Sequence, residues 1–361
     1  MKIGIIHGFV GGGGGTEKTL LALIEALVEK NHIVNLYTIS KPSITIANAK
    51  VHSILPFRFP IFGLYQRYME SKLIKKTKSD DIVFQASGGL VLPSRPNQQI
   101  IIYCHHDFQN ETRKTITKYK GIWSWYYQPY YLLSQRFVNQ IKNKNIHLIS
   151  NSKHIHDSLE KRFGKESTII HPPVELDEFA QSRSKENKVI TISRYSQEKN
   201  LEFAIDVMRD IDINYTLIGN TKTRSNEIYY EALTKRISGQ QNKSITLLKN
   251  ICRRKIVTEF LESTVYFHAS PETFGISIIE SMASGCIPIV PNNSAHMETV
   301  PIDELRFEPS NVKDAQDKIK KALSGDYDKY VELLKDSAKK YDKEFFKKKI
   351  IDYIEQFQSI V

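Results

Sequence analysis

Two carboxylates separated by seven residues, Glu272 and Glu280, mark the stretch of this chain most suited to chemistry. Short apolar runs at 265–268 and 287–290 bracket them and have the length and composition of buried strands. Between the runs, Gly275 precedes a helical pattern. Strand, glycine, helix and strand predict a βαβ unit in which backbone N–H groups at the helix start receive an anion. The two carboxylates would flank a ligand bound there.

Two cations follow another predicted strand, at 189–193. Arg194 and Lys199 lie between the end of that strand and a helix predicted over 201–209. Guanidinium and ammonium groups beside a helix N-terminus suit a diphosphate, and a solvated charge pair is the alternative interpretation. Gly219 follows at the exit of the next predicted strand.

The five glycines at 11–15 follow the first predicted strand and could approach a ligand closely. They do not match the phosphate loop of an NTPase, because two residues separate Gly15 from Lys18 and because Glu17 would repel a triphosphate. A dinucleotide loop is also disfavoured, since no acidic residue ends the second predicted strand. A merely flexible loop is the plain alternative. We expect Gly14 and Gly15 to belong to a loop that closes over a ligand bound mainly elsewhere.

The strand predicted from residue 100 ends in three polar residues, His105, His106 and Asp107. Ligands of doubly wound sheets gather at the carboxyl ends of strands, so all three residues are well placed to meet one. For His106, an ordinary packed or exposed histidine is an equal alternative.

The length of 361 residues predicts two domains, and a charged fraction of 25% is ordinary for a soluble protein. Cys104, Cys252 and Cys286 have neither disulfide nor zinc spacing and are expected to be reduced. No window reaches the roughly 18 apolar residues of a membrane-spanning helix. The opening residues are too short and glycine-rich for a secretion signal, so we expect a cytoplasmic protein.

The net charge of +11 is concentrated in the first half of the chain. Residues 1–170 contain 23 Lys and Arg against 11 Asp and Glu, whereas residues 171–361 contain 28 against 29. Such an imbalance suits an anionic surface, either membrane headgroups or nucleic acid. A basic helix is predicted at 66–79. The aromatic, lysine-rich segment at 119–137 suits a membrane interface, and the charge imbalance favours peripheral membrane association, with no nucleic acid partner expected. The alternative for the aromatic segment is a helix that packs its rings inward.

Alternating strand and helix patterns predict an α/β protein with two doubly wound domains. The first domain is expected at 1–170, and the Pro-rich and polar segment at 171–188 is expected to be a linker. The second domain is expected at 189–342. A last amphipathic helix within 343–361 is long enough to return to the first domain.

The chain resembles the retaining glycosyltransferases of family 4 over nearly its whole length. The resemblance rests on Glu272, seven residues and Glu280 in the setting Ser-Pro-Glu-Thr-Phe-Gly-Ile-Ser-Ile-Ile-Glu-Ser-Met-Ala-Ser-Gly. Ser193-Arg194, Lys199, Gly219 and the loop Gly14-Gly15-Thr16-Glu17 also fall where the family has its counterparts. The family implies the GT-B architecture, in which two doubly wound, Rossmann-like domains face each other across a cleft.

By this resemblance, Glu272 contacts the donor sugar, Glu280 contacts the nucleotide ribose, and His105 approaches the sugar. Arg194 and Lys199 hold the diphosphate. The remaining expected donor-binding residues are Gly14, Gly15, Gly219, Phe274, Gly275, Ile276 and Ser277. Residues 275–277 are expected to bind the diphosphate through their backbone N–H groups. The resemblance implies no metal and no other cofactor, and no Asp-x-Asp pair follows a predicted strand.

The expected activity is transfer of a hexose from a nucleotide sugar to a glycan or lipid-linked acceptor at the cytoplasmic membrane face. Asn151-Ser152 and His171-Pro-Pro-Val resemble the branch that extends lipid-linked oligosaccharides with mannose, which favours GDP-mannose, although that branch commonly has tyrosine where this chain has His171. Two alternatives are an NTPase switch built on the Gly11–Lys18 loop and a catalytically inert, sugar-binding scaffold of the same fold.

Overall fold

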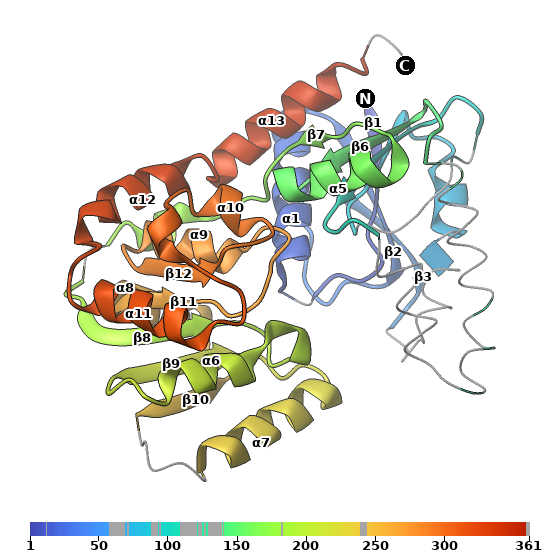
Figure 1. The fold of residues 1–361 in the computed structure, drawn as a ribbon. Helices are drawn as coiled ribbons and strands as arrows, with labels where there is room; N and C mark the ends of the chain where they lie inside the picture. The colour runs from blue at the N-terminus through green and yellow to red at the C-terminus, as the bar shows by residue number, and fades with distance from the viewer. Residues whose placement is uncertain are drawn as a thin grey trace. The chain divides into compact units, whose positions relative to one another are not determined.

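The computed structural model describes the chain except for residues 12, 58–68, 71, 88–92, 94, 109–120, 122–124, 126–127, 129–138, 140, 182, 239–243 and 359–361. The chain forms two compact units (Figure 1). Unit 1 comprises Met1–Pro173 and Lys343–Val361, and unit 2 comprises Val174–Asp342.

Unit 1 is built on a sheet with the strand order β3-β2-β1-β4-β5-β6-β7, in which all described pairs are parallel. The strands are β1 (Lys2–Ile6), β2 (Ile33–Ser40), β3 (Lys50–Leu55), β4 (Ile82–Gln85), β5 (Gln99–Cys104), β6 (Ile146–Ser150) and β7 (Thr168–Ile169). Its described helices are α1 (Gly15–Glu29), η1 (Ile74–Thr77), α5 (Lys153–Phe163) and α13 (Lys343–Glu355).

Alternate residues of the unit 1 strands supply two separate cores, because successive side chains of a strand point to opposite faces. On β5, Ile101 and Tyr103 join a core with α1 and α13, whereas Ile100 and Ile102 join a second core with α5. Strands that are apolar on both faces need helices on both faces, and this requirement produces the doubly wound arrangement.

The C-terminal helix α13 packs on α1, the first helix of the chain (Figure 1). Lys347 on α13 is 7% exposed and its Nζ donates to Glu25 Oε1 at 3.2 Å, Glu29 Oε1 at 2.6 Å and Glu344 Oε1 at 3.2 Å. Lys343 adds an ion pair to Glu25 at 2.6 Å. These contacts join the two ends of the chain within unit 1.

Unit 2 has a second parallel sheet with the strand order β10-β9-β8-β11-β12-β13. The strands are β8 (Glu186–Ile192), β9 (Asn214–Gly219), β10 (Ile245–Lys249), β11 (Ser263–Phe267), β12 (Ile287–Pro291) and β13 (Arg306–Phe307). The helices are η3 (Leu176–Phe179), η4 (Gln197–Lys199), α6 (Leu201–Met208), α7 (Arg224–Ser238), α8 (Arg253–Glu262), α9 (Ile276–Ala283), α10 (His296–Thr299), η5 (Asp303–Leu305), α11 (Val312–Leu323), η6 (Asp328–Tyr330) and α12 (Val331–Lys339). Helix α6 packs against α11, and α9 packs against α12 (Figure 1).

The structure therefore has the expected pair of parallel-sheet α/β domains. It differs at the linker predicted over 171–188, because the division between the units falls between Pro173 and Val174. Val174 and Phe179 are buried in the unit 2 core, and Glu186 already begins β8. The short strands β3, β7 and β13 were missing from the expected elements, since two-residue strands and a half-exposed edge strand carry little apolar pattern.

Most of the aromatic segment at 119–137 lies outside the described residues, and so does the start of the basic helix at 66–79. No helix in the described part of the chain combines the length and the apolar character needed to cross a membrane.

The ion pairs of Lys343 and Lys347 with Glu25 and Glu29 are expected to hold α13 on α1. The attraction of Lys343 and Lys347 lowers the pKa of Glu25 against a desolvation that would raise it, so the stabilisation is present above the ordinary glutamate pKa and is lost as pH falls through the lowered value. We expect Lys347→Met to accelerate hydrogen–deuterium exchange in α13 and α1 peptides at pH 7, and the difference from wild type to shrink near pH 4. The exposed neighbour Lys348→Met is the control, and equal exchange in the two variants would contradict the role of these ion pairs.

Candidate functional site

Glu272 and Lys199 meet in unit 2 because β8 and β11 are neighbouring parallel strands that end at the same edge of the sheet. Lys199 lies in η4 shortly after β8, and Glu272 follows β11. The Lys199 ammonium forms an ion pair with Glu272 Oε1, and His268 Nε2 donates to the same oxygen at 2.9 Å. The structure thus joins two of the predicted catalytic residues through one carboxylate oxygen.

The Glu272 carboxylate is ionised although its side chain is only 18% exposed. Burial alone would raise its pKa, but the hydrogen bond and charge of His268 and the charge of Lys199 outweigh burial and hold the pKa far below the ordinary value. Both contacts use Oε1, and Oε2 has no hydrogen-bond partner among the described residues. A fixed anion with one open oxygen can accept a hydrogen bond from a ligand hydroxyl.

The backbone of Glu272 is held by the segment that follows β12. Its N–H donates to Ser294 Oγ at 3.1 Å, and its carbonyl accepts from the N–H of Ala295 at 3.2 Å. The position of the carboxylate is therefore set by three separate parts of unit 2: η4, the end of β11 and the residues after β12.

Helix α9 begins beside this carboxylate at Gly275, which has φ of 91° and precedes the first helical residue, Ile276. The first capping hydrogen bond runs from the N–H of Ile278 to the Gly275 carbonyl at 3.0 Å. The N–H groups before Ile278 lie at the positive end of the helix, where an anion is stabilised. The predicted anion-binding role of Gly275, Ile276 and Ser277 is compatible with this geometry.

The second carboxylate of the motif, Glu280, is bound by an arginine. The Glu280 side chain is 5% exposed, and its Oε1 accepts from Arg253 Nη2 at 2.8 Å. Arg253 also forms a forked pair with Glu178 of η3 and lies over the Phe179 ring. Burial would lower the Arg253 pKa, but its two carboxylate partners raise it above the ordinary value. Glu280 is therefore a charge-paired carboxylate in a fixed orientation.

Arg194 and Gly219 lie at neighbouring strand ends. The Arg194 side chain is 60% exposed and forms an ion pair with Glu198 at 3.3 Å, so it does not join the Glu272 cluster. A Cβ atom on Gly219 would lie 2.3 Å from the carbonyl oxygen of Ser193 and 2.8 Å from the Tyr195 ring. Close packing of β8 against β9 thus accounts for glycine at this position.

Two predicted donor-binding residues have buried or half-buried apolar side chains. Phe274 is 3% exposed and packs edge-on against Tyr341, and Ile276 packs against the unit 2 core. The side chain of Phe274 therefore belongs to the core of unit 2.

In unit 1, the glycine loop is folded around Glu17. This buried carboxylate accepts hydrogen bonds from the N–H groups of Gly11 at 3.0 Å and Gly13 at 2.9 Å. In a phosphate loop those N–H groups would bind the nucleotide. A resident anion at this place argues against the NTPase alternative. Gly14 and Gly15 follow directly, with Gly14 in an extended conformation at the start of α1.

His105 lies at the carboxyl end of β5, as expected, and its ring is neutral. Nε2 lies 3.0 Å from the carbonyl oxygen of Ala86, which only accepts, so Nε2 carries the proton and Nδ1 keeps its lone pair. Burial lowers the pKa of His105 to about 4. His7, at the end of β1, is also buried with its pKa lowered to about 4. The neighbouring His106 and Asp107 bond within unit 1, to the N–H of Phe108 and the hydroxyl of Ser158.

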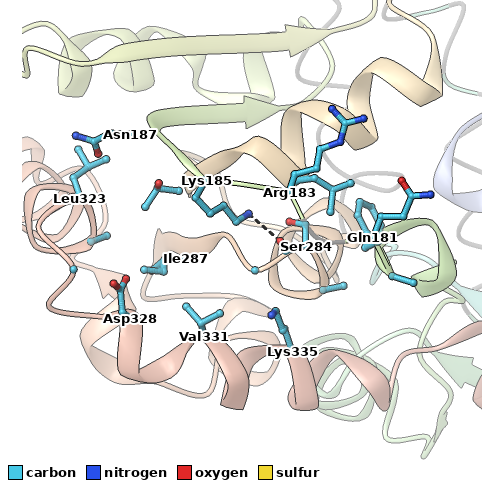
Figure 2. A pocket seen from close by; sticks show the side chains of 18 residues that line it. Gln181, Arg183, Lys185, Asn187, Ser284, Ile287, Leu323, Asp328, Val331 and Lys335 are labelled. Atoms are coloured by element: carbon cyan, nitrogen blue, oxygen red, sulfur yellow. Dashed lines mark hydrogen bonds between the residues drawn. The ribbon is translucent and has the colours of Figure 1, made fainter.

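A separate cavity of about 660 Å³ lies at the opposite edge of the unit 2 sheet, where strands begin and helices end (Figure 2). Lys185 is the central cation there, and its Nζ donates to the carbonyl oxygens of Ser284 at 2.8 Å and Phe260 at 3.1 Å. The ammonium thus caps the C-termini of α9 and α8. None of the predicted site residues lines this cavity.

Sequence reasoning missed His268 and Arg253 as partners of the two motif carboxylates. His268 was visible as the last residue of an apolar run, four positions before Glu272, which is a strand-end position. Arg253 gave no comparable signal, because its pairing with Glu178 and Glu280 joins parts of the chain far apart in sequence.

Two family models match the chain over almost all of its length. The model described as "Glycosyl transferases group 1" matches residues 175–341, and "Glycosyltransferase Family 4" matches residues 13–178. A curated relative from Dictyostelium discoideum, "GDP-Man:Man(3)GlcNAc(2)-PP-Dol alpha-1,2-mannosyltransferase", is 24% identical over 226 residues. The match covers 56% of this chain and 44% of the relative, so the chain spans less than half of that protein.

Solved structures share the fold over the whole chain. Sucrose-phosphate synthase from Thermosynechococcus elongatus has a TM-score of 0.77 at 15% identity, with 100% of both chains covered. HepE from Anabaena, in complex with UDP and glucose, has a TM-score of 0.73 at 14% identity, covering 98% of this chain and 99% of its own. WaaG, a glycosyltransferase involved in lipopolysaccharide biosynthesis, has the same score, identity and coverage.

The geometry at Gly275 leads to a prediction about stability. At φ of 91° an L side chain is strained, and an added Cβ would lie 2.7 Å from Ile278 Cδ1. We expect Gly275→Ala to destabilise unit 2 by about 1–2 kcal/mol, seen as a lower thermal unfolding midpoint. Gly14→Ala is the matched control, because Gly14 has φ of −92° and open space around its Cβ position. Equal midpoints for the two variants would show that the backbone at Gly275 is not constrained.

Proposed function

Because this chain belongs to the GT-B glycosyltransferases, with a family 4 domain and a group 1 domain, we propose that it moves a hexose from a nucleotide sugar to a lipid-linked or polysaccharide acceptor. The favoured transfer is of mannose from GDP-mannose, with retention of configuration. The name of the Dictyostelium relative supports a mannosyl donor, whereas HepE was crystallised with UDP and glucose, which supports a UDP-sugar. The donor assay below decides between them.

One observation carries the proposal: the ionised carboxylate of Glu272 beside the N-terminus of α9. Lys199 and His268 hold Oε1, which leaves Oε2 to accept a hydrogen bond from a hydroxyl of the donor sugar. The start of α9 at Gly275 then receives the diphosphate to which that sugar is attached. Sugar and diphosphate subsites three residues apart match the two halves of one donor.

The remaining roles follow the family resemblance. The Glu280 carboxylate, held by Arg253, binds the hydroxyls of the ribose. Arg194 and Lys199 approach the diphosphate, with the exposed Arg194 free to exchange its weak surface pairing with Glu198 for a phosphate. The neutral ring of His105 offers its Nδ1 lone pair to a sugar hydroxyl.

In this proposal, stabilisation of the charge that develops in the transition state accelerates the transfer. As the nucleoside diphosphate leaves, negative charge develops on the β-phosphate and the sugar becomes oxocarbenium-like. Lys199, Arg194 and the N-terminus of α9 oppose that negative charge, and each such contact contributes about 3 kcal/mol to lowering the barrier. The departing phosphate takes the proton of the acceptor hydroxyl as the new glycosidic bond forms on the same face. No metal is needed in this scheme, because protein cations supply the stabilisation.

The donor assay tests the proposal directly. We expect release of nucleoside diphosphate when the protein is incubated with membrane extract and one of GDP-mannose, UDP-glucose or UDP-N-acetylglucosamine, and we expect the rate to persist in EDTA. Glu272→Gln should lower the rate about 100-fold or more with unchanged folding, because it removes the fixed anion. Glu332→Gln on the surface of α12 is the control. A lack of turnover with every donor, or full activity in Glu272→Gln, would overturn the proposal.

We also propose that the basic first half binds the anionic membrane that presents the acceptor. The excess of 23 cations over 11 anions in residues 1–170 supports it. We expect the protein to float with vesicles containing phosphatidylserine and to be released at about 0.5 M salt, where charges are strongly screened. Equal flotation with neutral phosphatidylcholine vesicles would contradict an electrostatic association.

A further inference from the structure

A buried chain of hydrogen bonds connects Glu272 to Ser277 within unit 2. Glu272 Oε1 accepts from His268 Nε2 at 2.9 Å, His268 Nδ1 lies 3.1 Å from the Tyr266 hydroxyl, and that hydroxyl lies 2.8 Å from Ser277 Oγ. His268 is 2% exposed and Tyr266 is fully buried. The chain therefore runs through the protein interior from the carboxylate to the first turn of α9.

Stereochemistry fixes how His268 faces the carboxylate. A carboxylate only accepts hydrogen bonds, so the proton on Nε2 points at Glu272. The ring also stacks on Tyr266 at 6.0 Å with an interplanar angle of 18°, and meets the His296 ring edge-on at 5.6 Å. Packing on two sides, together with a contact between Nε2 and Ser270 Oγ at 3.2 Å, holds the imidazole where Nε2 meets Oε1 of Glu272.

The other ring nitrogen transmits the protonation state of His268 along the chain. In a neutral ring, Nδ1 accepts from the Tyr266 hydroxyl, which in turn accepts from the hydroxyl of Ser277. In an imidazolium, Nδ1 donates to Tyr266, whose proton then turns to Ser277 Oγ or to the carbonyl oxygen of Ile192 at 3.3 Å. When the Tyr266 proton turns to Ser277, that hydroxyl becomes an acceptor, and when it turns to Ile192, Ser277 remains a donor.

Several titratable groups face His268 from the neighbouring elements. Glu272 contacts the ring directly, and the ammonium of Lys199 pairs with the same carboxylate oxygen, Oε1. His296 of α10 donates from Nε2 to the carbonyl oxygen of Ser270 at 2.9 Å, and burial lowers its pKa to about 3, so it stays neutral. Tyr266 completes the set.

We propose that His268 is a positioning residue of the transfer reaction: it fixes Glu272 Oε1 and, through Tyr266, links the sugar-binding carboxylate to the Ser277 hydroxyl where α9 receives the diphosphate. The inference rests on the proposed function of this site. Its consequence is that loss of His268 impairs turnover of the bound donor much more than binding of a nucleoside diphosphate, because the diphosphate does not contact Glu272.

Substitution of His268 by Gln or by Asn distinguishes the contact at Nε2 from the contact at Nδ1. The amide nitrogen of Gln reaches the place of Nε2 and can still donate to Glu272, whereas that of Asn lies near Nδ1 and cannot. We expect His268→Asn and His268→Ala to lower kcat about 10- to 100-fold, and His268→Gln to keep a third or more of it. Affinity for GDP and UDP, measured by calorimetry, should change less than about threefold in all three. Equal losses in the Gln and Asn variants, or a parallel loss of nucleotide affinity, would reduce His268 to a packing residue.

A second measurement tests the chain without any turnover. Histidine-labelled protein reports the hydrogen bonds of the His268 ring nitrogens by NMR at a single pH, with the signals assigned by their absence in His268→Gln. We expect Ser277→Ala to shift the Nδ1 resonance, because the Tyr266 hydroxyl that contacts Nδ1 loses its partner on α9. In a Tyr266→Phe background the same substitution should have no effect.

The kinetic and NMR experiments distinguish failure of this inference from failure of the proposed function. A wild-type protein that turns over no donor overturns the proposed function, and the NMR measurement still tests the chain of hydrogen bonds. An active enzyme whose His268→Asn variant keeps full kcat, or a Ser277→Ala shift that survives in the Tyr266→Phe background, overturns the inference alone.

Discussion

A buried negative charge at residue 272 is the constraint on which the site in unit 2 depends. A carboxylate that is largely removed from water is stable in its charged form only when cations and hydrogen bonds compensate for lost hydration. Here Lys199 and His268 provide that compensation at one oxygen. The requirement explains why the end of β8 and the end of β11 must lie side by side, and why the loop after β12 holds the backbone of Glu272.

The same principle recurs at the other charged positions. Glu280 is matched by Arg253, Glu17 by the N–H groups of the glycine loop, and Lys347 by three carboxylates. Each pairing joins segments that are separate along the chain or folds a loop around a fixed charge. In unit 1, Glu17 argues against a phosphate site in the glycine-rich loop. The N–H groups that would bind a phosphate already donate to this carboxylate of the protein itself.

The sequence determined the class of fold and the spacing of the motif. Apolar runs of strand length, alternating with amphipathic helices, are sufficient to predict two doubly wound domains. The pattern indicates which faces of each strand and helix must be buried. The residues around Glu272 and Glu280 placed a glycine at the start of a helix, and this is where Gly275 lies. Those features are local, so a linear pattern can express them.

Only the tertiary structure decided which groups meet. The pairing of Lys199 with Glu272, the separate surface pairing of Arg194, and the burial of Phe274 depend on strand order and core packing. The division between the units likewise falls earlier than the polar segment at 181–188 suggests, because Val174 and Phe179 pack into unit 2. Sequence spacing fixes distances along one helix or loop, whereas contacts between elements follow from the packing of whole faces. His268 combines both kinds, since Tyr266, Ser270 and Glu272 are close to it in sequence, whereas His296 is brought to it by packing.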